Sequence, residues 1–151
     1  MPFRLIAALA ATCALFVSSL IVAPPASAVT LEINYAVDFS GTVVCNGRVT
    51  TGGLDVAGTG CFRNDGDQVI VTDDAYDSQR VGVHWRLRDG SRRGLCINKD
   101  GNGSRRWCNK DFPESQDIQL RVGLCDGSVH VCETLADYNS WSPWGAYTPV
   151  G

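Results

Sequence analysis

The sequence predicts an all-β protein, a small antiparallel β-sandwich of about seven strands that is stapled by disulfides. Apolar and polar residues alternate with a period of two in several segments, which is typical of half-buried strands. No segment of helical length has a period of 3.6 residues, and Gly, Asp and Asn cluster between the alternating segments as turn signals. Six cysteines between residues 45 and 132 complete the pattern of a small cross-linked domain.

Residues 1–28 have the features of a cleaved signal peptide. Arg4 supplies a positive start, residues 5–23 are mostly apolar, and a proline pair ends any helix before the small residues 26–28. Cleavage there leaves residues 29–151 as a single secreted, extracellular β-domain. The alternative is an uncleaved anchor, because an apolar stretch of this length nearly spans a bilayer. After cleavage we expect no contact with a membrane.

The cysteines predict disulfides and not redox or metal chemistry. Cys13 lies in the predicted signal peptide, and an even set remains behind it: Cys45, Cys61, Cys96, Cys108, Cys125 and Cys132. Exported cysteines are normally oxidised, so we expect three cross-links, each contributing roughly 2–4 kcal/mol to stability. Spacing alone leaves several pairings open. We expect the sequential one (45–61, 96–108, 125–132), because each pair brackets a short stretch rich in turn residues.

The first expected strand covers residues 29–40. Its apolar side chains fall at every second position, and Ala36 is the one exception on the polar face. Such a strand is long for a globular protein, and it forms either part of the domain's own sheet or an N-terminal extension. A hairpin is expected over residues 42–50, because Asn46-Gly47 is a preferred pair for a two-residue turn. Four glycines within residues 52–60 predict an irregular approach to the second cysteine.

The clearest later strand covers residues 80–88, and further strands are expected at 68–72 and 118–124. Within 80–88 one face is apolar and joins the core: Val81, Val83, Trp85 and Leu87. The opposite face is expected to be a solvated basic stripe: Arg80, Gly82, His84, Arg86 and Arg88. Two aromatic residues of the first strand, Tyr35 and Phe39, also fit the core. Residues 138–151 form an aromatic, proline-containing tail, which either packs over the sandwich or stays free.

Charge is unevenly distributed in a chain with a formal net charge of −3. Residues 29–79 hold eight acids and two bases, residues 80–110 nine bases and two acids, and residues 111–151 six acids and one base. The basic middle segment is either neutralised by its acidic flanks within the fold, or it forms a cationic patch for an anionic partner such as a cell-wall polymer or an acidic protein surface. The acidic overall balance argues against nucleic acid.

No set of residues predicts catalysis or metal binding. Residues 98–104 resemble half of a calcium loop, but Asn109 stands where a bidentate Glu is needed and nearby cations oppose a metal, so a glycine-rich hairpin loop is expected. Asp73, Asp74 and Asp77 fit a solvated turn. His84 and His130 lie on outer strand faces without the nucleophile or positioned water that a general base needs. We therefore expect no enzyme activity, no catalytic residue, no metal and no cofactor.

Three sets of residues are candidates for binding. An extended N-terminal strand could add itself to the sheet edge of another secreted or cell-surface protein, through Leu31, Ile33, Tyr35 and Val37. The basic stripe could contact an acidic surface through Arg80, Arg86 and Arg88. Aromatic rings stack on sugar faces or anchor interfaces, and the tail presents Trp141, Trp144 and Tyr147 at a spacing of three.

Residues 73–126 resemble small exported proteins of Streptomyces and related actinobacteria. The similar stretches are DSQRVGVHWRLRDG (77–90), GLCINKDGNG (94–103), CNKDFPE (108–114) and IQLRV (118–122). This family has no established activity, so the resemblance implies a fold and no functional residue. The layout, a small secreted domain behind an N-terminal extension, is also similar to that of the adaptor subunit of Streptomyces umbrella toxin particles.

These observations favour a secreted, non-enzymatic module that binds another protein, such as the adaptor of an extracellular antibacterial toxin complex. A secreted enzyme inhibitor is the first alternative, in which the cysteine-bracketed loop 97–107 enters an active site. A cell-wall carbohydrate-binding module is the second alternative, and it would use the aromatic tail. The sequence does not identify the partner.

Overall fold

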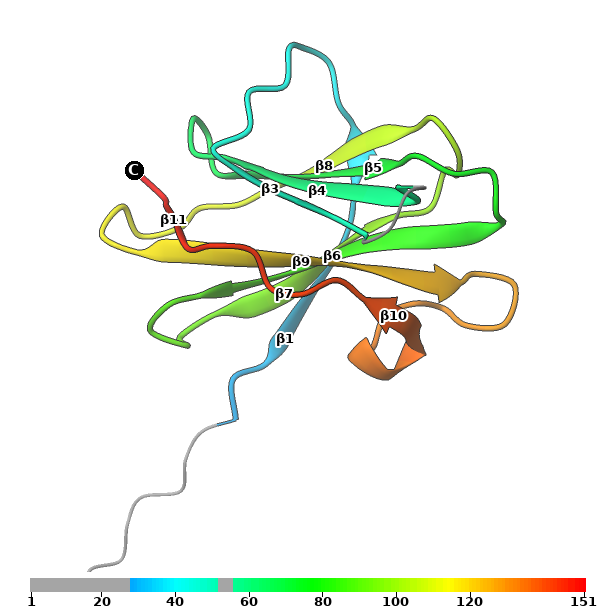
Figure 1. Cartoon of the computed structure of the whole chain (residues 1–151). Coiled ribbons are helices and arrows are strands. Elements are labelled where there is room, and N and C mark those ends of the chain that lie inside the picture. The colour runs from blue at the N-terminus through cyan, green and yellow to red at the C-terminus, as the bar shows by residue number, and fades with distance from the viewer. Residues whose placement is uncertain (1–27, 52–55) are drawn as a thin grey trace, which may run out of the picture.

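The computed structural model describes residues 28–51 and 56–151, which form two β-sheets (Figure 1). The predicted signal peptide lies outside the described residues except for Ala28. Sheet A has the order β1-β7-β6-β9-β10, with β11 also paired to β9, and sheet B has the order β2-β8-β5-β4-β3. The strands are β1 (Leu31–Tyr35), β2 (Val37–Asp38), β3 (Gly47–Thr50), β4 (Gly58–Arg63), β5 (Gln68–Asp73), β6 (Gln79–Leu87), β7 (Arg93–Asn98), β8 (Arg105–Asn109), β9 (Asp117–Asp126), β10 (Tyr138–Trp141) and β11 (Thr148–Pro149).

The predicted all-β fold is confirmed, with more strands than the expected seven because several are very short. The longest strands, β6 and β9, pair antiparallel at the centre of sheet A. The predicted inner face of β6 is buried against sheet B, and Trp85 has 0% of its surface exposed. The core between the sheets also takes apolar side chains from β4, β5, β9 and the segment after β8, namely Phe62, Val69, Val71, Phe112, Ile118, Leu120 and Val122.

The three disulfides have the predicted sequential pairing. Cys96–Cys108 joins β7 of sheet A to β8 of sheet B inside the core, so it ties the two sheets together. Cys45–Cys61 tethers the segment before β3 to β4 of sheet B. Cys125–Cys132 fixes the connection between β9 and β10.

The N-terminal segment is not the single long strand that its alternation predicts. It forms β1 in sheet A, passes Ala36, and continues as β2 in sheet B. Ala36 donates its N–H to the carbonyl of Ile97 at 2.9 Å, and Trp107 Nε1 then donates to the carbonyl of Asp38 at 2.8 Å on the other sheet. β1 also runs parallel to β7, so the sandwich is not wholly antiparallel. The segment is therefore part of the domain and not a free extension.

The hairpin expected over residues 42–50 is also absent from the structure. Gly47 lies within β3, and Asn46 donates its N–H to the carbonyl of Phe62 at 2.8 Å, so both residues extend the pairing with β4 instead of reversing the chain. Gly60 lies in the regular strand β4, where its lack of a Cβ makes room for the facing sheet: a Cβ would lie 2.8 Å from methyl groups of Val83 and Val122. The predicted irregularity is therefore wrong for residues 58–60, while residues 52–55 lie outside the described parts of the chain.

A second, smaller apolar cluster covers the outer face of sheet A. It contains Leu95, Ile97, Cys125, Cys132 and Tyr138, with Leu31, Ile33, Leu135 and Trp141 packed against it. Two glycines make room for the aromatic members. A Cβ on Gly82 would overlap the phenol ring of Tyr138, and one on Gly123 would lie 2.5 Å from the indole ring of Trp141. Sheet A is thus covered on both faces.

Candidate functional site

The predicted basic stripe and the predicted aromatic tail lie on each other. The Arg86 guanidinium lies 4.1 Å from the centre of the Trp144 ring, and that of Arg88 lies 4.6 Å from the Tyr147 ring. Arg121 of the neighbouring β9 lies 4.4 Å from the Trp141 ring and 4.8 Å from the Trp144 ring. Such contacts stabilise both partners. The stripe is therefore not simply solvated, and of the two alternatives for the tail the structure shows the packed one.

His84 lies beneath this aromatic layer, which corrects its expected place on an exposed outer face. It is 4% exposed, and its ring centre lies 4.9 Å from that of Trp144. Arg121 Nε donates to its Nδ1 at 3.1 Å. Burial, followed by the nearby arginines, lowers the pKa of His84 to about 3, so the ring is neutral at physiological pH. A neutral, covered imidazole fills the core of this layer and does not face solvent.

The charges of the middle segment are largely matched by the acidic flanks. Arg92 Nε and Lys110 Nζ lie 2.8 Å and 3.1 Å from the carboxylate of Glu32 on β1, and the Lys110 side chain is only 4% exposed. Arg88 pairs with Asp117 at 2.7 Å, and Arg106 contacts Asp38 and Asp100. Of the two interpretations of the charge pattern, neutralisation within the fold fits these pairs.

The N-terminal candidates divide into two kinds. Leu31 and Ile33 are half-buried in the outer cluster of sheet A. Tyr35 and Val37 are 39% and 58% exposed, which corrects the expected core position of Tyr35. The Tyr35 hydroxyl donates to Glu133, and Lys99 Nζ lies 3.3 Å from the centre of its ring.

Three connections lie at one end of the sandwich, and two of them carry exposed apolar side chains that the sequence analysis did not select. The three connections are residues 74–78 between β5 and β6, 99–104 between β7 and β8, and 127–137 between β9 and β10, all at the right in Figure 1. We call them the loop end. Three of its side chains are highly exposed: Tyr76 (96%), Val129 (70%) and Val131 (62%). The sequence feature that could have identified these side chains is isolated apolar residues within a polar stretch rich in turn residues, as in Ala-Tyr-Asp-Ser and Gly-Ser-Val-His-Val.

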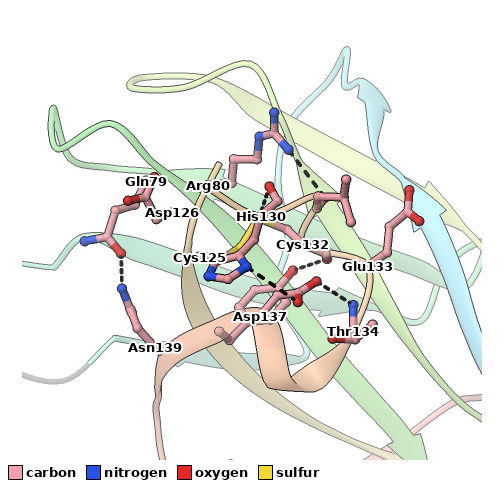
Figure 2. The surroundings of a disulfide bond; sticks show 12 residues. Gln79, Arg80, Cys125, Asp126, His130, Cys132, Glu133, Thr134, Asp137 and Asn139 are labelled. Atoms are coloured by element: carbon pink, nitrogen blue, oxygen red, sulfur yellow. Dashed lines mark hydrogen bonds and ion pairs between the residues drawn. A yellow bond between two sulfur atoms is a disulfide. The ribbon is translucent and has the colours of Figure 1, made fainter. Parts of the chain in front are cut away.

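The β9–β10 connection is held in one conformation by several bonds (Figure 2). Beside the Cys125–Cys132 disulfide, Asp126 Oδ1 accepts hydrogen bonds from the backbone and hydroxyl of Ser128 at 2.9 and 2.6 Å. These bonds lower the pKa of the Asp126 carboxyl. Arg80 Nη1 donates to the carbonyl of Val131 at 3.4 Å. Arg80, a predicted partner-binding residue on β6, is therefore hydrogen-bonded to this loop. The short 3-10 turn η1 (Leu135–Asp137) then leads into β10.

The β7–β8 connection is held as firmly, and it crosses between the sheets instead of forming the expected hairpin. Asn98 is fully buried, and its side chain donates to both the carbonyl and the hydroxyl of Ser104 at 3.1 and 2.9 Å. Asp73 at the end of β5 accepts the N–H of Gly103 at 2.8 Å and donates its own N–H to the carbonyl of Ser104 at 3.0 Å. A cavity of about 390 Å³ lies between residues 75–79 and 100–102.

The acidic group beside this loop is not a uniformly solvated turn. Asp74 and Asp77 are exposed, but Asp73 is 1% exposed, and its Oδ2 has no hydrogen-bond partner in the described structure. Burial raises the pKa of Asp73 to about 6, with further increases from Asp77 and Asp74. His130 is exposed, and its Nδ1 lies 3.9 Å from Asp137.

Within residues 28–51 and 56–151, no three His, Cys, Asp or Glu side chains are grouped as a metal would require. The same residues contain no helix that is both long and apolar enough to cross a membrane. Comparison of the chain with protein-family models, with curated proteins and with solved structures finds no match in any of the three.

Proposed function

We propose that the mature chain is a secreted, non-enzymatic module that binds another extracellular protein through its loop end. The observation that carries the proposal is the exposure of Tyr76, Val129 and Val131 on connections that are individually fixed by a disulfide and by backbone hydrogen bonds. Buried tyrosine and aliphatic anchors supply much of the binding energy at protein interfaces. A rigid loop loses little conformational entropy on binding.

The charge of the loop end also indicates what kind of surface the partner has. The connections that bear the three anchors also carry exposed carboxylates, among them Asp74, Asp77 and Glu133, so a complementary surface is basic and has an apolar pocket. The disulfides fit an extracellular setting. An adaptor within an extracellular toxin complex satisfies this description.

An inhibitor of a secreted enzyme is the second candidate, since it would use the same end of the molecule. The rigid loop 99–104 projects there beside Tyr76 and could enter an active site. Carbohydrate binding has less support, because Trp141, Trp144 and Tyr147 each stack on an arginine of the domain's own sheet.

The test is affinity capture from culture medium with immobilised mature protein, followed by mass spectrometry. The bait is compared with Tyr76→Ala and Val131→Asp, which alter exposed side chains and leave the core intact. The matched control is Val44→Asp, because Val44 is 61% exposed but borders residues 63–65 of the β4–β5 turn. We expect one or a few proteins that bind the wild type and the control but neither loop-end variant. Equal capture by all four baits would refute the proposal.

A further inference from the structure

Strand β1 is an outermost strand of sheet A and has a neighbour on one side only. Ala36 donates its N–H to Ile97, and backbone groups of successive strand residues point to opposite edges. The backbone N–H and C=O groups of Leu31, Ile33 and Tyr35 therefore point away from β7. Within residues 28–51 and 56–151, no hydrogen bond occupies these groups. Such an edge is a template for pairing with another strand.

We propose that two copies of the chain pair antiparallel along β1, about a twofold axis through Ile33. In this register Ile33 lies opposite Ile33 of the second copy, and Leu31 lies opposite Tyr35. All three residues have outward-facing backbone groups, so each opposed pair exchanges both of its hydrogen bonds. Registers centred on Glu32 or Asn34 also oppose outward-facing groups, but within β1 they pair only Leu31 with Ile33 or Ile33 with Tyr35, and the first also places Glu32 opposite Glu32. The register centred on Ile33 pairs all three outward-facing residues and avoids that repulsion.

The side chains are self-complementary in this register. On the outer face every cross-strand pair is apolar, and the partly exposed ring of Tyr35 meets Leu31. On the inner face Glu32 lies opposite Asn34, so like charges do not meet. Inward-pointing charges often protect edge strands from association. Here the Glu32 carboxylate is already matched by Arg92 and Lys110, which removes that protection.

The pairing joins the two copies of sheet A into one continuous sheet. β1 runs parallel to β7, and the connection after β7 belongs to the loop end. An antiparallel pair therefore places the two loop ends at opposite ends of the dimer, facing away from each other. This goes beyond the proposed function, because a dimer of this kind would hold two partner molecules at once.

The test uses charge reversal across the axis. Ile33→Lys and Ile33→Glu each place two like charges opposite one another, so each variant alone should be a monomer with dimer affinity reduced roughly tenfold or more. An equimolar mixture of the two should form a heterodimer, which is visible by light scattering coupled to size exclusion and by native mass spectrometry. Tyr35→Pro removes an outward N–H that the pairing needs but no hydrogen bond to β7, and it also loses the side-chain contacts with Glu133 and Lys99; it should be a folded monomer as well. Circular dichroism checks the fold of each variant.

Tyr76→Ala is the control and should remain a dimer, which separates this inference from the proposed function. A wild type that stays monomeric from micromolar to millimolar concentration would overturn the pairing. Dimers of Ile33→Glu that match the wild type would also overturn it. If the Lys and Glu variants are both monomeric and fail to associate when mixed, the register centred on Ile33 is wrong.

Discussion

The buried carboxyl of Asp73 gives a sharp prediction about stability and pH. Asp73 ends β5 beneath the loop end, is 1% exposed, and receives one side-chain hydrogen bond, from the N–H of Ala75 at 3.3 Å. Its other oxygen has no partner in the described structure. Burial raises its pKa from 3.8 to about 6, and the negative charges of Asp77 and Asp74 add to the effect. The folded protein therefore binds this proton more tightly than the unfolded chain does.

The sign and size of the effect follow from that difference. The stabilising contribution of the protonated carboxyl is complete below pH 3.8 and is lost as the pH rises to about 6. Each pKa unit corresponds to about 1.4 kcal/mol, so the free energy of unfolding should fall by about 2–3 kcal/mol across this window. Asp73→Asn cannot ionise. As the pH rises from 3.8 to about 6, the free energy of unfolding of Asp73→Asn should therefore increase relative to that of the wild type by about 2–3 kcal/mol.

Urea denaturation followed by fluorescence, from pH 3.5 to 8, measures this difference directly. Carboxyls with lowered pKa values, such as Asp126 and Asp137, are the same in both proteins, so their opposite pH dependence cancels. Asp111→Asn is the matched control, because Asp111 is exposed and does not contribute to the shift at Asp73, so its replacement should leave the pH profile nearly parallel to that of the wild type. If the stability difference between Asp73→Asn and wild type is constant over this pH range, the argument from burial is wrong.

The remaining predictions concern the cover of sheet A and the anchoring of β1. Gly123→Ala should lower stability by roughly 1–3 kcal/mol and shift tryptophan fluorescence, because the new methyl group would displace Trp141. Arg121→Ala should cost about 1–2 kcal/mol, since it removes a cation stacked between two indole rings; thermal melts would measure the loss, and a value near zero would contradict the stacking. Glu32→Ala should cost roughly 1–3 kcal/mol because it leaves the buried Lys110 unpaired. Adding Lys110→Met should restore part of this stability, and additive losses in the double variant would count against the ion pair.

The parts of the fold that could be predicted are those in which a sequence pattern reflects a local property, such as which side of a strand a residue faces. Alternation in residues 80–88 correctly predicts which side chains face the core, because a strand exposes opposite faces at successive residues. The cysteine pairing was predictable because each pair lies close in sequence. The break at Ala36 was not, because Tyr35 and Val37 keep the same alternation although they belong to different sheets. Periodicity identifies a strand's faces and does not identify its neighbour.

The Asn46-Gly47 prediction failed for a related reason. The dipeptide favours a tight turn, but the hydrogen bond from Asn46 to Phe62 and the nearby Cys45–Cys61 disulfide hold the chain in line with β4. Long-range pairing thus outweighed a local preference. In the same way, the buried state of His84 depends on a segment nearly sixty residues later in the chain.

The contacts on sheet A determine where a partner could bind. In sequence, Arg86 and Trp144 each had the features of an exposed contact residue, yet the cation covers the ring and the ring covers the cation. A partner that used either one would first have to separate them and would lose their mutual stabilisation. Tyr76 carries no such cost, because its ring is 96% exposed. The outward backbone groups of Ile33 likewise have no competing bond to break. Binding at the loop end and at the edge of β1 therefore disrupts the least existing structure.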